Sequence, residues 1–312
     1  MDASEDQAAP EPEPKAAPRE ANEPALLEAE NVRIDRDGVP ELENLSFTST
    51  AMASERAVVL GAPRSFFEAC AGIERAKSGE LRICGTVADE AARAGKTAAS
   101  PASMRFPEKW TLLDLATWSA RLGGVSKSRA EIGAHQALSS LDLRGDSRVV
   151  LAKAPVHVRA LAPLVAALAT QAPVLLFEDP TTQLPSDLAR ALAKRVVTAL
   201  EGTTWILFTG HIGLSSPFAL HAEEAIVIGG GKVSQGAVAE VAAREGTYAV
   251  RIHGEARTFA KLVTSKGGTS KGDGDELLID LGEKLRTRDL FDLADEAHSV
   301  IVELRPLSRA FV

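Results

Sequence analysis

The stretch "VVLGAPRSFFEACAG", residues 58–72, decides how the rest of the chain is interpreted. It starts with an apolar run typical of a strand at the centre of a sheet, Gly61 allows a tight turn, and residues 64–72 have the composition of a short helix closed by glycine. A strand, a glycine turn and a helix in this order form the start and the end of a phosphate-binding loop. Because the further glycines and the lysine of such a loop are absent, the stretch predicts the scaffold of a phosphate site without its loop.

Composition and charge exclude several classes of protein. Of the 312 residues, 45% are hydrophobic and only 4% aromatic, which suits a layered α/β fold better than a β-sandwich. The net charge is −8, of which −5 falls in residues 1–25, so the remainder carries −3 and lacks the basic surface of a nucleic-acid-binding protein. Cys70 and Cys84 have no neighbour at metal-ligand spacing, which predicts no metal site. Because no apolar run approaches about 18 residues, we expect a cytoplasmic protein without direct membrane insertion.

The pattern along the chain predicts three segments and an α/β fold class. Residues 1–25 are rich in Ala, Pro and Glu, which predicts a disordered acidic tail. Residues 26–245 begin with an antiparallel strand pair and continue with buried strands that alternate with helices. This predicts a mixed, largely parallel sheet with an antiparallel β subdomain and a helical subdomain at about 106–165. Residues 246–312 predict a small C-terminal α/β domain of βαβ type.

Local patterns add expectations about single elements. Residues 86–104 are small and polar, so we expect an irregular connection there, and residues 265–274 are expected to form a loop tip. Ser186 is the expected N-cap of the helix that ends before Gly202. Helical spacing predicts that four large side chains share one face of the helix near residues 112–122: Leu112, Leu115, Trp118 and Leu122.

Six stretches, taken in order, carry a family resemblance. They are "ENVRIDRDGVPELENLSF", "SGELRICG", "FPEKWTLLDLATWSARLGG", "ALATQAPVLLFEDPTTQL", "TTWILFTGH" and the closing "VIVELRPLSRAFV". Together they resemble the nucleotide-binding subunit of an ATP-binding-cassette (ABC) transporter, and the closing stretch is similar to the tail of ABC-2-type exporter ATPases. The resemblance covers roughly residues 26–312 and implies a P-loop NTPase-like ABC ATPase core.

The resemblance places the family's phosphate loop at the opening stretch. Gly61, Arg64 and Ser65 would be its vestigial positions. The span from Gly61 to the closing glycine is about four residues shorter than in the family. Pro63, which has no N–H group, stands near the place of the lysine. The backbone amides and the lysine that surround phosphate in the family are therefore predicted to be missing.

Other family motifs depart from the pattern as well. The acidic pair at the end of a central strand would be Glu178 and Asp179, in reversed order, so each carboxylate is displaced by about an ångström, enough to cost about a hundredfold in rate. His211 follows Gly210 and so stands one position later than the family's switch histidine. Residues 154–158, where the signature loop would lie, have none of its phosphate-binding residues.

These departures predict a pseudo-ATPase that serves as a scaffold or regulatory subunit of a membrane transport or cell-envelope complex. No residue is expected to be catalytically competent, and no cofactor is expected. In the family, two subunits form each ATP site from one phosphate loop and the partner's signature loop, and this chain departs in both. The implied partners are a membrane permease subunit, a second ABC ATPase subunit, or both, at the cytoplasmic face of the inner membrane.

Two alternatives stay open. The first is an active transporter ATPase that binds ATP and Mg²⁺ with divergent loops, in which Arg64 replaces the lysine, Asp179 is the base and His211 is the switch residue. The second is a stand-alone cytoplasmic adaptor without a transporter.

Overall fold

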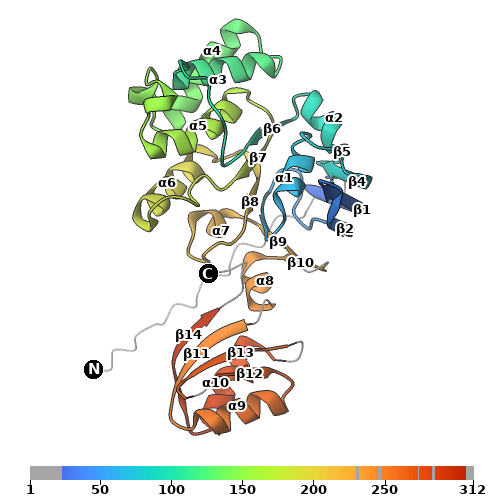
Figure 1. Cartoon of the computed structure of the whole chain (residues 1–312), viewed down its shortest axis with the longest axis vertical. Helices are drawn as coiled ribbons and strands as arrows, with labels where there is room; N and C mark the ends of the chain where they lie inside the picture. Colours follow the sequence, from blue (N-terminus) through green and yellow to red (C-terminus); the bar gives the residue numbers. More distant parts are fainter. Residues whose placement is uncertain (1–22, 230–231, 245–246, 273, 283–284, 307–312) are drawn as a thin grey trace, which may run out of the picture.

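The computed structural model describes residues 23–229, 232–244, 247–272, 274–282 and 285–306, and these form three sheets with helices packed against them (Figure 1). Residues 1–22 of the predicted acidic tail lie outside the described residues, as does the domain boundary predicted at 245–246. Within the described ranges, no helix has both the length and the apolar composition needed to cross a membrane.

A six-stranded sheet forms the centre of the molecule. In spatial order its strands are β10 (Lys232–Gly236), β9 (Glu224–Gly229), β3 (Arg56–Leu60), β8 (Thr204–Thr209), β7 (Val174–Glu178) and β6 (Thr97–Ser100). The strands from β9 to β6 pair in parallel, whereas β10 pairs antiparallel with β9. β3, β7, β8 and β9 are buried on both faces, which explains their continuous apolar runs. The predicted mixed, largely parallel sheet is confirmed.

A smaller antiparallel sheet shares a hydrophobic core with one face of the central sheet. Its strand order is β2 (Val39–Thr48), β1 (Leu27–Arg36), β4 (Ser78–Ile83) and β5 (Thr86–Val87). Helix α1 (Arg64–Cys70) belongs to the same core and buries Phe66 and Phe67. Both rings contact Phe208 of β8, with ring centroids 6.3 and 5.3 Å apart. These contacts fix α1 close to the end of β3.

Three helices pack together into a helical layer on the other side of the sheet. They are α3 (Leu112–Leu122), α4 (Lys127–Ser140) and α5 (Val156–Ala169) (Figure 1). α5 is buried nearly all round, as its Ala-rich apolar composition predicts. Helices α6 (Ser186–Ala199) and α7 (Pro217–His221) extend the same hydrophobic core, and two short turns, η1 (Arg144–Asp146) and η2 (Leu151–Lys153), connect α4 to α5.

Two expectations about these helices are wrong. α3 buries Leu112 and Leu115 together with two alanines, whereas Trp118 and Leu122 are 44% and 82% exposed. The small alanines let α3 approach the Ala-rich α5 closely, so the packed face lies over them rather than over the larger side chains. Helix α6 begins one residue earlier than expected, because Pro185 is its N-cap and Ser186 its first residue.

The expectation of an irregular connection at residues 86–104 is also wrong. The segment contains β5, the helix α2 (Ala88–Arg93) and β6. β6 has no large apolar side chain, but its backbone pairs with β7 from Thr97 opposite Val174 to Ser100 opposite Phe177. Tertiary pairing therefore overrides a weak strand propensity. Gly95, with φ +68°, ends the turn after α2 in a conformation that favours glycine.

The C-terminal part of the chain forms its own sheet. After α8 (Val238–Arg244), the strands β11 (Thr247–His253), β12 (Thr269–Lys271), β13 (Glu276–Asp280) and β14 (Val300–Pro306) alternate with α9 (Ala256–Ser265) and α10 (Thr287–Glu296). All neighbours are antiparallel in the order β12-β13-β11-β14, which is a ferredoxin-like βαββαβ arrangement. The small α/β domain is thus confirmed as a fold, but residues 265–274 are not only a loop tip, because backbone pairing with β13 orders β12 within them.

Candidate functional site

The candidate site lies where β3, β7 and β8 end at the same edge of the central sheet. In a parallel sheet the carboxyl ends of neighbouring strands meet, and ligand sites in such folds lie outside them. Gly61 follows β3, Glu178 ends β7 with Asp179 after it, and His211 follows β8 by two residues. Only residues 61–63 separate β3 from α1, so the helix begins directly beside the sheet edge.

The turn after β3 is tightly packed against two neighbouring strands. Gly61 has φ +70°, and its N–H donates to the carbonyl oxygen of Thr209 at 3.1 Å. A Cβ at this position would lie 2.9 Å from the backbone oxygen of Ile228, so a larger residue does not fit without movement. The backbone of this turn is therefore hydrogen-bonded to β8 and packed closely against β9.

Arg64, the first residue of α1, lies between two carboxylates. Its Nε atom is 3.0 Å from Glu68 Oε1 and 3.8 Å from Glu178 Oε1. Its Nη1 atom donates to the hydroxyl of Ser103 at 3.3 Å. The sequence predicted a site position for Arg64 but not these partners, although Glu68 stands four residues along the same helix, a spacing that favours ion pairs.

Ser65 does not face the other site residues. It is fully buried, and its hydroxyl donates to the Glu41 carboxylate on β2. This bond joins α1 to the antiparallel sheet. Glu41 was not identified from the sequence, since 24 positions separate the pair and no local pattern connects them.

The two acidic residues at the end of β7 have different partners. Glu178 Oε2 accepts a hydrogen bond from the N–H of Ala102 at 2.8 Å. Asp179 Oδ1 accepts from both the N–H and the hydroxyl of Thr181 at 2.7 Å, so the side chain caps the turn that follows. Burial raises the pKa of Asp179 above its ordinary value, although the Thr181 bonds and the charge of His211 lower it.

His211 is exposed near this pair. The hydroxyl of Thr209 donates to its backbone oxygen at 3.0 Å, and Gly210 is exposed as well. The structure therefore brings Arg64, Glu178, Asp179 and His211 to one edge, while Ser65 points elsewhere.

A cavity of about 520 Å³ opens beside the acidic pair. The sheet contributes Glu178, Asp179 and Gly210, and the first turns of α5 contribute Val156 and Arg159. It lies between the sheet edge and the helical layer, so side chains from both form its wall. Arg159 carries no signal in the sequence as a site residue, because only the fold brings this exposed cation near the acidic pair.

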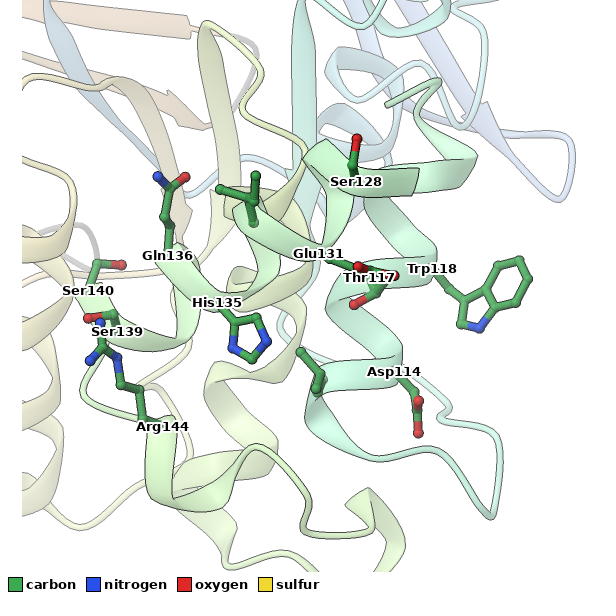
Figure 2. A pocket seen from close by; sticks show the side chains of 12 residues that line it. Asp114, Thr117, Trp118, Ser128, Glu131, His135, Gln136, Ser139, Ser140 and Arg144 are labelled. Carbon is green, nitrogen blue, oxygen red and sulfur yellow. The ribbon is translucent and has the colours of Figure 1, made fainter. Parts of the chain in front are cut away.

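A second cavity, about 1000 Å³, lies on the helical layer between α3 and α4, and none of its lining residues lines the first (Figure 2). Figure 2 shows the Trp118 indole projecting outward from α3. The Arg121 guanidinium lies 4.4 Å from the centre of the Trp118 ring, and Trp110 stacks on it with centroids 6.4 Å apart. Ile132 of α4 is 57% exposed on the same groove. Exposed aromatic, aliphatic and arginine side chains together are typical of protein-binding surfaces.

Among the described residues, no group of three or more His, Cys, Asp or Glu side chains is arranged to hold a metal ion. The first cavity has the arginine-paired Glu178 on its sheet side and both the exposed Arg159 and the apolar Val156 on its α5 side.

Comparison with known proteins identifies the fold. No protein-family model matches the chain, and no curated protein sequence matches it. Solved structures do resemble it. One is cbiO1 from Clostridium perfringens, part of the ABC transporter complex cbiONQ, with a TM-score of 0.58 and 16% identity over 70% of this chain and 91% of that one. Another is an ATP-binding cassette of an ABC transporter in its ADP conformation, with a TM-score of 0.58 and 12% identity over 70% and 93%.

A nucleotide-free ATP-binding cassette from an ABC transporter is similar as well, with a TM-score of 0.57 and 13% identity over 68% of this chain and 91% of that one. At these identities the likeness is one of fold. The chain has the P-loop NTPase-like ABC ATPase fold, with a mixed sheet, an antiparallel sheet and a helical layer, as the resemblance of its sequence implied.

Proposed function

We propose that the chain is an ABC-ATPase-like subunit of the ABC-2 exporter type that does not hydrolyse ATP and serves as a scaffold or regulatory subunit of a membrane transport or cell-envelope complex. The single observation that carries this proposal is the turn of three residues, 61–63, between β3 and α1. A phosphate loop needs several backbone N–H groups directed at one phosphate, and a turn of this length offers few.

The groups around this turn do not fit ATP and Mg²⁺. The N–H of Gly61 donates to β8, and Pro63 has none. Arg64 contacts two glutamates, and the buried Ser65 hydroxyl, which would take the place of an Mg²⁺ ligand, donates to the Glu41 carboxylate on β2. Each of these groups thus has a protein partner where a triphosphate would need a donor or a metal ligand.

The energetic consequence is large. Charge-assisted hydrogen bonds contribute about 1.5–3 kcal/mol each. A site that lacks three of them would lose about 5 kcal/mol, which converts a micromolar dissociation constant to the millimolar range or weaker. We therefore infer that ATP at cellular concentration does not control this subunit.

The proposed role is to bind other proteins. The groove between α3 and α4, with Trp118 and Ile132 exposed, is the proposed contact for a helix of a membrane permease subunit. The neighbours in fold support such a partner in general, because they are parts of ABC transporters. We place the subunit at the cytoplasmic face of the membrane. A second ABC ATPase subunit is the other proposed partner.

Nucleotide titration tests the proposal. Purified full-length protein is titrated with a fluorescent ATP analogue and Mg²⁺, and we expect no saturation below about 1 mM. Saturation in the micromolar range that Arg64→Ala abolishes and Arg93→Ala preserves would instead support an active ATPase in which Arg64 replaces the lysine, Asp179 is the base and His211 the switch residue. Arg93 is a matched control, since it forms an ion pair with Asp89 on α2.

Partner binding is tested separately in the native host. We expect the chain to co-purify with membranes and with a permease subunit, and Trp118→Ala to weaken this association, whereas Leu220→Ala, an exposed leucine on α7, should not. Glu178→Gln and Asp179→Asn should leave it unchanged. A chain that stays fully in the soluble fraction and binds another protein there would favour the stand-alone adaptor.

A further inference from the structure

Residues 101–111, here called the connector, link β6 to α3 and so join the central sheet to the helical layer. Residues at the sheet edge bind the first part of this connector. The N–H of Ala102 donates to Glu178 Oε2 at 2.8 Å. The hydroxyl of Ser103 accepts from Arg64 Nη1 at 3.3 Å. Both bonds come from residues at the sheet edge, one at the end of β7 and one at the start of α1.

The helical layer holds the second part of the connector. Phe106 and Trp110 pack against the hydrophobic core that contains α3, α4 and α5. The backbone oxygen of Trp110 accepts from the N–H of Leu151 at 2.9 Å, and Thr111 forms a backbone bridge with Val150. The connector thus binds the sheet edge with its first part and the helical layer with its second part, and it supplements the hydrophobic core through which the helices pack on the sheet.

Arg64 and Glu178 form one network at the first part. The guanidinium contacts Glu68 and Glu178, whose side chains are 18% and 17% exposed, while Arg64 itself is 43% exposed. A planar guanidinium can serve several acceptors at once, which a lysine ammonium does less well. Two groups of this network, the Arg64 guanidinium and the Glu178 carboxylate, bind the connector.

We propose that Arg64, Glu68 and Glu178 are an internal latch that fixes the connector, and with it the helical layer, against the sheet without a bound ligand. In many nucleotide-binding proteins, a terminal phosphate and its metal ion hold the loops that move. In this chain the Arg64 side chain would hold the connector in place of a phosphate. The inference rests on the proposed function, because a subunit that ATP does not control needs another group to fix its shape.

Hydrogen exchange of the full-length protein tests the latch at the connector. We expect Arg64→Ala to accelerate exchange in the peptide that covers residues 101–105 about two- to fivefold, since a partly exposed ion pair is modest in strength. Glu178→Ala should accelerate it more, because the acceptor of the Ala102 N–H is removed. Arg64→Lys should fall between wild type and Arg64→Ala. Arg93→Ala, which breaks an ion pair of the same i,i+4 spacing on α2, should leave this peptide unchanged.

A distance measurement tests the consequence for the helical layer. Spin labels are placed at Ser128→Cys on α4 and at Glu201→Cys before β8, both exposed positions. We expect one narrow distance distribution in the otherwise wild-type protein and a broader or shifted one with Arg64→Ala. An Arg64→Ala distribution identical to that of wild type, or connector exchange at the wild-type rate, overturns the latch. Nucleotide titration of the wild-type protein decides the proposed function independently of both results.

Discussion

Substitution of Glu224, at the start of β9, tests how the antiparallel sheet is joined to the central sheet. Its side chain is 1% exposed and accepts hydrogen bonds from the residues that connect β2 to β3. Thr50 donates its N–H at 2.9 Å and its hydroxyl at 2.8 Å to one oxygen, and the N–H of Ala51 and the hydroxyl of Ser49 donate to the other. The carboxylate thus ties the connection between the antiparallel and central sheets to β9.

Removing this carboxylate leaves the two Thr50 donors without a protein acceptor, whereas the Ala51 N–H still has Ser49 Oγ at 3.1 Å and the Ser49 hydroxyl still has the Ala51 carbonyl oxygen at 3.2 Å. Each orphaned donor costs about 1–3 kcal/mol, so the loss of both Thr50 acceptors costs about 2–6 kcal/mol in total. We therefore expect Glu224→Ala to lower the free energy of unfolding by about 4 kcal/mol. Glu224→Gln keeps one oxygen but turns an NH₂ group toward the Ala51 N–H, so we expect a loss of about 2 kcal/mol.

The assay is urea denaturation followed by fluorescence of the tryptophans, one of which, Trp205, is fully buried in the central sheet. Glu223→Ala is the matched control, because the neighbouring Glu223 forms a partly exposed ion pair with Arg56 at 2.6 Å that should contribute less than about 1 kcal/mol. Equal losses for Glu224→Ala and Glu223→Ala would show that the four hydrogen bonds do not tie the two sheets together.

Three further outcomes are expected. Gly61→Ala should lower the free energy of unfolding, measured by urea denaturation, by about 2–3 kcal/mol, and Gly202→Ala should lower it by about 1 kcal/mol. Both glycines have φ near +70°, but only at Gly61 would the added Cβ also contact a backbone oxygen. Equal losses for the two variants would contradict the packing described for the turn. Asp179→Asn should raise the melting temperature at pH 7 but not at pH 3. The raised pKa means that the native state binds its proton more tightly than the unfolded state, so the wild-type carboxylate destabilises the fold as pH rises above about 3.8; no gain at pH 7 would contradict this. Burial raises the pKa of Cys84 from 9.0 to about 11. Since only the thiolate reacts, iodoacetamide at pH 8 should modify Cys84 about a hundredfold more slowly than an ordinary thiol. Rapid labelling would contradict the burial of this thiol.

Much of the fold could be predicted because the central strands carry their own signal. β3, β7 and β8 are continuous apolar runs, since both faces of the sheet are covered, and each is bounded by a turn residue. β6 could not be predicted in this way. Its four residues are small, and they form a strand because β7 offers a row of backbone partners, which is a property of the assembled sheet.

The candidate site was predictable in its positions but not in its bonds. Glu178 and Asp179 follow a buried strand, which places them at the sheet edge whatever their partners are. The contact of Glu178 with Ala102 joins residues 76 positions apart, and its contact with Arg64 depends on how α1 leaves the sheet. A side chain's partner across the fold has no local pattern in the sequence, whereas the Arg64–Glu68 pair, one helical turn apart, does.

The ferredoxin-like sheet has a topological consequence for how the molecule can change over evolutionary time. Its first strand, β11, pairs directly with its last, β14, with Tyr248 opposite Pro306, so the polypeptide enters and leaves the module at neighbouring points. Because the two ends of such a module lie side by side, it can be duplicated or exchanged while the fold of the rest of the subunit is preserved. New binding specificities can therefore be acquired at this end of the chain while the architecture around the six-stranded sheet stays as it is.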